Sequence, residues 1–529
     1  MASVGPLLCT LLALLLGGAP QPGPRTLPTT IQDDAVLLHG SDASVRQAIN
    51  QIASLGAGYV RLTASWSAIA PAPDAQRMPG APFDPSSSQT YPYLGFHDLD
   101  RAVADATRAG LKVMIDIAFW APRWAVGRDA PNHQYNYAPD PTRYGEFAHA
   151  VATRYSGRFP SRSPLPAVRL YTVWNEPNNA AFLQPQWRRS ADGGWIPESP
   201  HIYRRLYQAA YPQIKGAGAT NQVLIGATSA FGSTVPGRGS VEPIEFVRDL
   251  ACVDELLLPL QVPECQGYQP LRADGFSHHP YSLHTTPAAH SPDPGAVPLA
   301  DLPRLESLLG LLSLTGRFRT DFPVYVTEYG YFTDPPDPFA PFTPEDQARF
   351  IGWSTYMAWS DPNMRMFAQF LLRDSQTGPG RPGTPSHWSL YQTGLYYHDG
   401  QPKPAAEAFR LPFWVQPIVG LGPPRVLLFG QVRAAHGTPQ VVQVERLSPG
   451  GQAWLPVPVF TPSCAAQDQF LTNKAGYLLT AAASGGSTMF RLAWRRPGGG
   501  WEYGPPISSV DAPPIPITGT QVQPRTPLW

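Results

Sequence analysis

The amino-acid sequence predicts a (β/α)8 TIM barrel of the α/β class, followed by a small all-β, sandwich-like domain. Between residues 31 and 413, short apolar runs rich in β-branched residues alternate with amphipathic helical patterns, as in βαβ units around a parallel sheet. Beyond residue 413 the helical periodicity ends, and strand-like runs separated by turn clusters follow. The first predicted strand is not followed by a Gly-rich phosphate turn, which disfavours an open doubly wound sheet.

The barrel is predicted to contain eight strands, each a short apolar run next to a turn or a helical pattern. The predicted strands are Ala35–His39, Tyr59–Ala64, Lys112–Ala118, Val168–Trp174, Gln222–Thr228, Gly275–His278, Val324–Thr327 and Met366–Leu372. Helical spacing of apolar residues fills the gaps. The predicted helices are Ser41–Leu55, His97–Ala109, Tyr144–Phe159, Ile202–Lys215, Pro243–Cys252, Leu302–Leu314, Pro344–Trp359 and Pro404–Leu411.

The N-terminal segment is typical of an export signal. Leu7 to Leu16 is nearly all leucine, and small residues follow as far as Ala19. This run is too short to span a bilayer but suits the apolar part of a signal peptide. We therefore expect a signal peptide over residues 1–19, a linker over 20–30, a secreted protein and no membrane span. The β domain is expected over 414–510, and a Pro-rich tail over 511–529.

Charge and cysteine usage narrow the function classes. Lys plus Arg and Asp plus Glu number 39 each. The chain therefore has no excess of positive charge that would attract nucleic acid or an anionic membrane. A neutral carbohydrate fits this balance, and nothing indicates an oligomeric state. Cys252 and Cys265 are expected to form a disulfide if the chain is exported, although two unrelated buried thiols are the alternative. No C-x-x-C pair is present, so neither a structural zinc site nor another cofactor is expected.

Two glutamates stand at the ends of predicted strands, where a barrel builds its active site. Glu176 lies in the run Val-Trp-Asn-Glu-Pro-Asn after the fourth strand, and Pro177 prevents that strand from continuing. Glu328 lies in Val-Thr-Glu-Tyr-Gly after the seventh strand. Glycosidic bond cleavage needs two such carboxyl groups on opposite sides of the anomeric carbon. The alternative, solvated loop carboxylates, is less favoured for two glutamates three strands apart.

These two motifs resemble clan A of the glycoside hydrolases. The resemblance covers about residues 30–415 and is closest to the β-xylosidase/α-L-iduronidase and cellulase-like families. It implies that Glu176 is the general acid/base and Glu328 the nucleophile of a retaining hydrolase, with carboxyl groups about 5–5.5 Å apart. Sugar, linkage, and exo or endo action do not follow from it. The alternatives are a transglycosylase on the same residues, a non-catalytic carbohydrate-binding protein, or an unrelated barrel that uses Asp116 or histidines with a metal.

Further residues match the pattern of that clan. The resemblance implies that Arg61, on the second strand, keeps the nucleophile ionised, with a structural ion pair as the alternative. It also implies that His279 and Tyr281, after the sixth strand, lie near the substrate; His278 should face the other way because neighbours on a strand alternate. A metal at the paired histidines is not expected. Asn175 is expected to donate a hydrogen bond to a sugar hydroxyl.

Aromatic residues on the loops are candidates for stacking against sugar rings. Trp66 and Trp120 are the leading candidates because they directly follow the second and third strands. The eighth strand lacks the Trp with which many clan members form the floor beneath the reacting sugar. Phe370 or Trp388 is expected to replace it. The aromatic residues of the β domain are expected to serve packing rather than polysaccharide binding.

Overall fold

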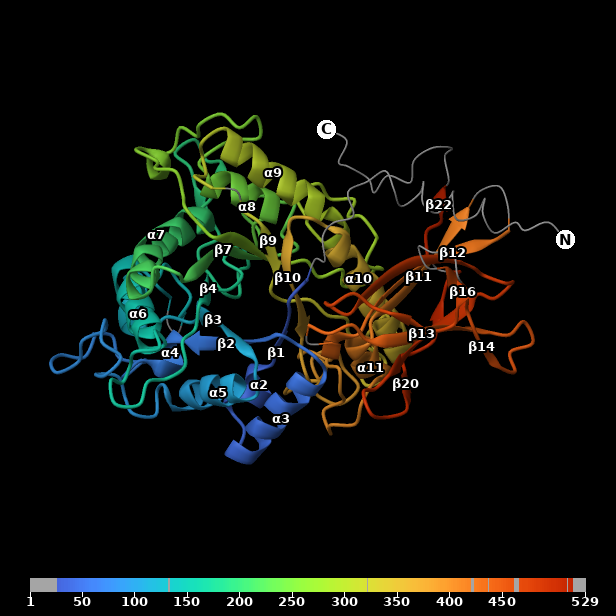
Figure 1. Cartoon of the computed structure of the whole chain (residues 1–529). Coiled ribbons are helices and arrows are strands. Elements are labelled where there is room, and N and C mark those ends of the chain that lie inside the picture. Colours follow the sequence, from blue (N-terminus) through green and yellow to red (C-terminus); the bar gives the residue numbers. More distant parts are fainter. Residues whose placement is uncertain are drawn as a thin grey trace.

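The structure is a computed structural model that describes residues 26–131, 134–320, 322–419, 423–435, 437–460, 466–510 and 512–516. Figure 1 shows an α/β barrel, coloured blue to yellow, beside a β domain in orange and red. The predicted signal peptide, Cys9 and Cys464 lie outside the described residues.

The prediction of a TIM barrel is confirmed. Within the described residues, eight parallel strands close in the order β1-β10-β9-β8-β7-β4-β3-β2, with each strand hydrogen-bonded to the next in register. In this closed order β4 lies next to β3, and β9 lies on the opposite side of the barrel from β3. The barrel strands are β1 (Thr29–Gln32), β2 (Tyr59–Ser65), β3 (Lys112–Ala118), β4 (Leu170–Val173), β7 (Gln222–Ser229), β8 (Gly275–His279), β9 (Val324–Val326) and β10 (Met364–Phe370).

The predicted first strand is wrong. Ala35–His39 falls in the short helix α2 (Asp34–Leu38), and β1 lies earlier, at Thr29–Gln32. The reason is a cap: the Asp33 side chain accepts a hydrogen bond from the Val36 amide and starts the helix there. β1 also begins within the segment predicted as a linker.

Helices surround the barrel (Figure 1) and begin where capping residues satisfy their first amide groups. In α10, Thr343 and Asp346 form a capping box, with Pro344 at the first helical position. In α6, Asp140 accepts from two amides of the first turn. The remaining bounds are α3 (Asp42–Ser54), α4 (Trp66–Ile69), α5 (His97–Arg108), α6 (Pro141–Arg154), α7 (Ser199–Ala217), α8 (Pro243–Leu250), α9 (Leu302–Leu314), α10 (Pro344–Ser360), α11 (Pro404–Arg410), η1 (Arg123–Ala125), η2 (Pro263–Cys265), η3 (Leu299–Asp301) and η4 (Arg433–Ala435).

An apolar layer fills the inside of the barrel near the start of the strands. It consists of buried side chains from five strands, Met114, Leu170, Leu224, Tyr325 and Met366. Side chains alternate along a strand, so the next inward position on β3 after Met114 is Asp116. The barrel therefore changes from an apolar plug to a polar interior toward the carboxyl ends of its strands, where barrel enzymes place their chemistry.

The β domain consists mainly of two sheets packed against the barrel. The first sheet has the order β18-β12-β11-β22, and the second is built on β14-β13-β19-β20. The strands are β11 (Phe413–Val419), β12 (Arg425–Gln431), β13 (Val441–Leu447), β14 (Trp454–Pro456), β15 (Val459–Phe460), β16 (Ala466–Gln467), β17 (Phe470–Leu471), β18 (Tyr477–Ala483), β19 (Met489–Arg495), β20 (Trp501–Tyr503), β21 (Ile507–Ser508) and β22 (Ile515–Pro516). β22 lies within the predicted tail and pairs with β11.

The contact between the two parts is aromatic and close. Trp353 of α10 stacks on Trp414 of β11, with ring centroids 4.4 Å apart. Gly352 beside it lies so near the Phe413 carbonyl that a Cβ atom would sit 2.1 Å from that oxygen. The Arg433 guanidinium, from the β domain, donates to the hydroxyl of Thr355 on α10. These contacts fit the expectation that aromatic residues of the β domain serve packing.

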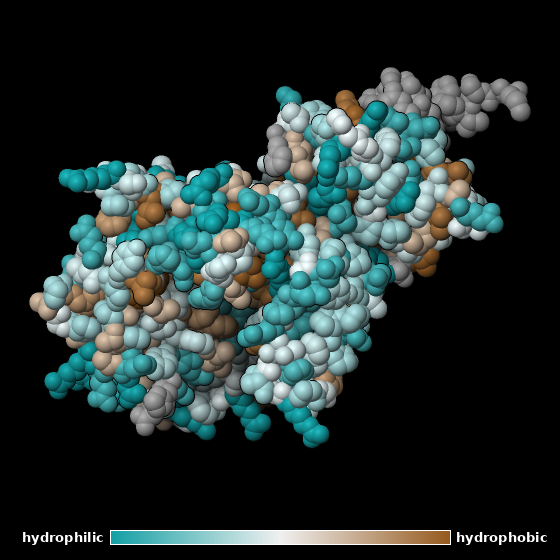
Figure 2. All heavy atoms as spheres, turned by 90° about the horizontal axis from the view of Figure 1, so that it is seen from below, coloured by the Kyte–Doolittle hydropathy of each residue, from teal (hydrophilic) through white to brown (hydrophobic). Residues whose placement is uncertain are grey.

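The surface is mainly polar. Figure 2 shows a face on which hydrophilic and intermediate residues predominate, while apolar residues form small, separate groups. Among the described residues, no helix combines the length and apolar character that a membrane span needs.

Candidate active site

Glu176 is held at the carboxyl end of the barrel by an unusual stretch of backbone after β4. Trp174 has φ 63° and Glu176 has φ 39°, a left-handed conformation that costs a non-glycine residue about 1–3 kcal/mol. Neighbouring strands maintain it: the Trp174 amide donates to the Ile117 carbonyl, and the Glu176 amide donates to the Ala227 carbonyl. The strained turn therefore fixes the direction of the Glu176 side chain.

Glu328 follows β9 by two residues and is nearly buried, at 7% exposed, as is Glu176 at 8%. The Arg61 guanidinium donates to Glu328 Oε1 at 2.6 Å, and the Tyr281 hydroxyl donates to Oε2 at 3.1 Å. Both oxygens of this carboxylate thus accept hydrogen bonds from the protein. Such an arrangement places a positive charge beside the carboxylate and restricts rotation of the side chain.

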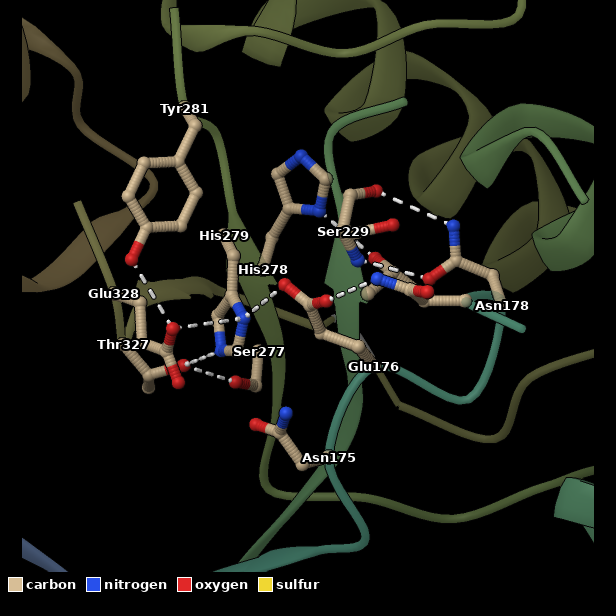
Figure 3. A network of polar contacts seen from close by, with 12 residues as sticks. Asn175, Glu176, Asn178, Ser229, Ser277, His278, His279, Tyr281, Thr327 and Glu328 are labelled. Atoms are coloured by element: carbon tan, nitrogen blue, oxygen red, sulfur yellow. Dashed lines mark hydrogen bonds and ion pairs between the residues drawn. The ribbon is translucent and has the colours of Figure 1, made fainter. Parts of the chain in front are cut away.

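The two carboxylates face each other with His279 between them (Figure 3). One oxygen of Glu176, one of Glu328 and a ring nitrogen of His279 all lie within 4.8 Å of one another. His279 Nδ1 is 3.0 Å from Glu176 Oε1 and 3.6 Å from Glu328 Oε2. The other Glu176 oxygen accepts a hydrogen bond from Asn179 at 2.7 Å. The structure thus brings together two glutamates that are 152 positions apart in the sequence (328 − 176).

Arg61 is fully buried and connects the site to the strands around it. Its Nη2 atom donates to Asp116 Oδ2 at 2.9 Å and to Asn175 Oδ1 at 3.1 Å. Its Nη1 atom also donates to Gln32. Burial opposes the charged guanidinium, but Asp116 and Glu328 outweigh it and hold the pKa of Arg61 above its ordinary value. Because the Asn175 side-chain oxygen already accepts a hydrogen bond from Arg61, its amide nitrogen is the group that remains to contact a ligand.

The paired histidines have different roles. His278 Nε2 donates to the Val297 carbonyl and Nδ1 accepts from Thr228, each at 2.8 Å. Burial lowers the pKa of His278 to about 3, so the ring is neutral and structural. His279 faces the opposite side of the strand from His278, and its Nδ1 atom contacts Glu176 Oε1. Its Nε2 atom lies 3.0 Å from the Thr327 hydroxyl, which lies 2.6 Å from Ser277 Oγ.

Of the two tryptophans predicted to stack on sugar, the geometry supports only one. Trp66 is 0% exposed and packs parallel to Phe147, with ring centroids 5.7 Å apart, and edge-on to Trp124. A fully enclosed indole presents no face to a ligand, because Trp66 begins helix α4, which turns it toward the core. Trp120 is 43% exposed after β3, and its Nε1 atom donates to the Ala181 carbonyl in the loop that follows Glu176.

The floor position after the eighth strand is occupied by a cluster of aromatic residues. Phe370 ends β10 and meets Tyr281 edge-on at 6.4 Å and Tyr391 at 5.1 Å. Burial and the negative charges of Glu328 and Glu176 raise the pKa of Tyr391 to about 12, which places this tyrosine in the field of both carboxylates. Trp388, the other candidate, packs edge-on against His387. Phe370 with Tyr391 is therefore the better match for the floor.

The site contains two further features that bear on ligands. Glu176, His279 and Glu328 have the spacing of metal ligands, but Glu328 already shares its charge with Arg61, and a cation there would meet the guanidinium. A cavity of about 490 Å³ lies elsewhere, at the start of α5, where Tyr91, His97 and Arg154 are among its lining residues. It holds neither carboxylate.

The chain was compared with known proteins. No known protein family and no curated protein matches it. Solved structures that match include a glucosidase from Croceicoccus marinus, with 13% identity over 88% of this chain and 97% of that chain and a TM-score of 0.49. Others are a GH5_18 protein from Streptomyces cattleya in complex with GlcNAc (16% identity, 73% and 79% coverage, TM-score 0.45) and an exo-beta-1,4-mannosidase from Opitutaceae bacterium strain TAV5 (15%, 74% and 59%, 0.42). The three TM-scores all lie below 0.5.

Several residues of the site were not singled out from the sequence as part of it. Thr327, Tyr391 and Gln32 reach the site from the position after β9, from the loop after β10 and from β1. Thr327 could have been predicted, because it directly precedes Glu328 at the end of a barrel strand and carries a hydroxyl group. Tyr391 lies 21 positions after Phe370 (391 − 370) in an irregular loop, and no local pattern indicates where such a loop folds back.

Proposed function

We propose that this protein is a retaining glycoside hydrolase that acts through a covalent glycosyl-enzyme. The observation that carries the proposal is that one carboxylate oxygen of Glu176 and one of Glu328 lie within 4.8 Å of each other at the carboxyl ends of two barrel strands, in different surroundings. Inverting enzymes separate their carboxyl groups by about 6.5–9.5 Å to admit a water molecule. The closer approach here supports direct attack by one carboxylate.

The surroundings of the two glutamates support distinct roles. Glu328 accepts hydrogen bonds from Arg61 and Tyr281, which suits an anionic nucleophile. Within the described residues, the Glu176 carboxyl group lies within hydrogen-bond distance of the Asn179 and His279 side chains, which suits a group that gains and loses a proton. In this proposal Asn175 and the aromatic residues Tyr281 and Tyr391 contact the sugar that reacts.

The proposed reaction has two steps. A Glu328 carboxylate oxygen attacks the anomeric carbon while Glu176 transfers its proton to the departing glycosidic oxygen, giving an ester to Glu328 and a free alcohol. Glu176, now ionised, removes a proton from water, whose oxygen attacks the same carbon and releases Glu328. The sugar keeps its anomeric configuration, and both glutamates return to their starting states.

Enzyme variants and a panel of aryl glycosides test this proposal. Glu328→Gln should abolish turnover of every substrate. Glu176→Gln should slow substrates with poor leaving groups far more than those with activated leaving groups, because the latter need no proton. Glu255→Gln is a matched control, since the Glu255 side chain is 84% exposed. Full activity in Glu328→Gln would contradict the proposal.

We also propose that the chain is exported. The leucine-rich segment at Leu7–Leu16 and the Cys252–Cys265 disulfide support this. N-terminal sequencing of the protein recovered from its native source should begin after Ala19. Recovery of an intact N-terminus from cytosol would contradict export.

A further inference from the structure

A second cluster of metal-ligand side chains lies apart from the two glutamates, at the start of α7 and just after α8. Cys252 and Cys265 are joined by a disulfide, with Cα atoms 5.6 Å apart. A ring nitrogen of His201 and both sulfur atoms lie within 4.8 Å of one another. These are the ligand types that a soft divalent cation such as Zn²⁺ prefers.

The environment of the His201 side chain also points to a ligand. It is fully buried, and neither ring nitrogen has a hydrogen-bond partner within the described residues. Leaving a buried polar group without a partner is energetically unfavourable. Asp249 Oδ1 lies 3.9 Å from His201 Nε2, beyond hydrogen-bond distance. The proposed activity uses none of these groups, so an imidazole facing a pair of sulfur atoms calls for another explanation.

The two cysteine segments are held in place without the disulfide. Arg204 of α7 donates to the carbonyls of Asp249 and Leu250 on one side, and to the Glu264 carbonyl beside Cys265 on the other. Arg317 donates to the Cys252 carbonyl at 2.9 Å. Five-donor guanidinium groups suit such multiple contacts. Reduction of the disulfide therefore leaves both sulfur atoms close to each other and to His201.

We propose that the reduced protein binds a zinc-class divalent cation through Cys252, Cys265 and His201, so that this corner of the barrel alternates between a disulfide and a metal site. A dithiol reductant supplies two electrons and two protons and becomes a disulfide itself, giving two cysteine thiols. Metal binding then releases both thiol protons to solvent and leaves two thiolates and one imidazole on the cation. Water completes a tetrahedral shell. Asp249, 3.9 Å from His201 Nε2, is the carboxylate that would orient the imidazole once it moves within hydrogen-bond distance.

Cobalt binding to the full chain tests the proposal. Cys9→Ser and Cys464→Ser are introduced first, so that only the two site cysteines remain. The protein is reduced with a phosphine, freed of reductant without air, and titrated with Co²⁺. We expect one Co²⁺ per chain, with a sulfur-to-cobalt charge-transfer band and the visible bands of tetrahedral cobalt, both removed by Zn²⁺. The oxidised protein and a Cys252→Ser, Cys265→Ser variant should show neither.

The histidine separates this site from adventitious thiol binding. His201→Phe should weaken Co²⁺ binding by about 10–100-fold or more, and Asp249→Asn by about tenfold. No charge-transfer band in the reduced protein, or an unchanged affinity in His201→Phe, would overturn the proposal. If His201→Phe does not fold by near-ultraviolet circular dichroism, X-ray absorption of the zinc-loaded reduced protein decides. Two sulfur ligands at about 2.3 Å with nitrogen at about 2.0 Å support the site, and a shell without sulfur or without nitrogen overturns it.

Discussion

Arg61 donates to Glu328 across 2.6 Å from a position with no solvent exposure. The same guanidinium donates to Asp116 and Asn175, so one side chain from β2 ties together residues on or after β3, β4 and β9. Together with Tyr281, this cation holds the proposed nucleophile in one direction. Its replacement therefore gives the first prediction.

Arg61→Lys should lower kcat/KM by about 100-fold, because the ammonium group cannot reproduce the planar fork that contacts Glu328 and Asp116 together. Arg61→Met should in addition reduce the free energy of unfolding by about 3–5 kcal/mol, since two buried carboxylates lose their counter-charge. Steady-state kinetics and denaturant unfolding measure the two effects. Equal kcat/KM in Arg61→Lys and the unmodified protein would show that the contact to Glu328 is structural only.

Thr327 should act as a positioning residue for His279. Thr327→Val keeps the shape of the side chain but removes the hydroxyl beside His279 Nε2. The loss of this hydrogen bond should lower kcat about tenfold. The pH profile of kcat should also move, because the His279 ring that touches Glu176 is no longer held in one orientation. Thr327→Ser should restore both. A lower kcat with an unmoved pH profile would limit Thr327 to packing.

The two tryptophans should respond in opposite ways to truncation. Trp66→Ala removes a fully enclosed ring and should reduce the free energy of unfolding by about 3–5 kcal/mol. Trp120→Ala should leave stability unchanged and raise KM by roughly tenfold, because its exposed ring is free to stack on sugar. Thermal unfolding and KM values for an oligosaccharide separate the two. An unchanged KM in Trp120→Ala would remove Trp120 from the substrate-binding residues.

His278 should make the protein less stable in acid. Its pKa is about 3 in the folded protein against 6.5 ordinarily, so on acidification the unfolded chain takes up the proton first. His278 has no effect on the free energy of unfolding above pH 6.5, and its destabilising effect grows as the pH falls toward 3. At about pH 5 it should reach about 2 kcal/mol. His278→Gln should flatten the dependence of the denaturant midpoint on pH. Parallel slopes for the variant and the unmodified protein would contradict the assignment.

Much of the fold and the centre of the site followed from the sequence because both depend on local signals. Apolar runs mark the strands, and Pro177 marks the end of β4 beside Glu176. The failures have physical causes as well. Asp33 converts an apolar run into helix α2 by satisfying one amide group. Trp66 follows a strand but belongs to a helical turn that points it inward. Tyr391 lies near the two carboxylates because its loop folds back over the barrel, and no residue spacing in the sequence predicts that.

The central claim is that Glu328 becomes covalently bonded to the sugar. An activated 2-deoxy-2-fluoro glycoside slows the second step more than the first, so that the intermediate accumulates and mass spectrometry of the digested protein locates it. The account predicts one sugar per chain, attached to the peptide that contains Glu328, and no label in Glu328→Gln. Label on any other residue, or turnover with inverted anomeric configuration and no label, would contradict it.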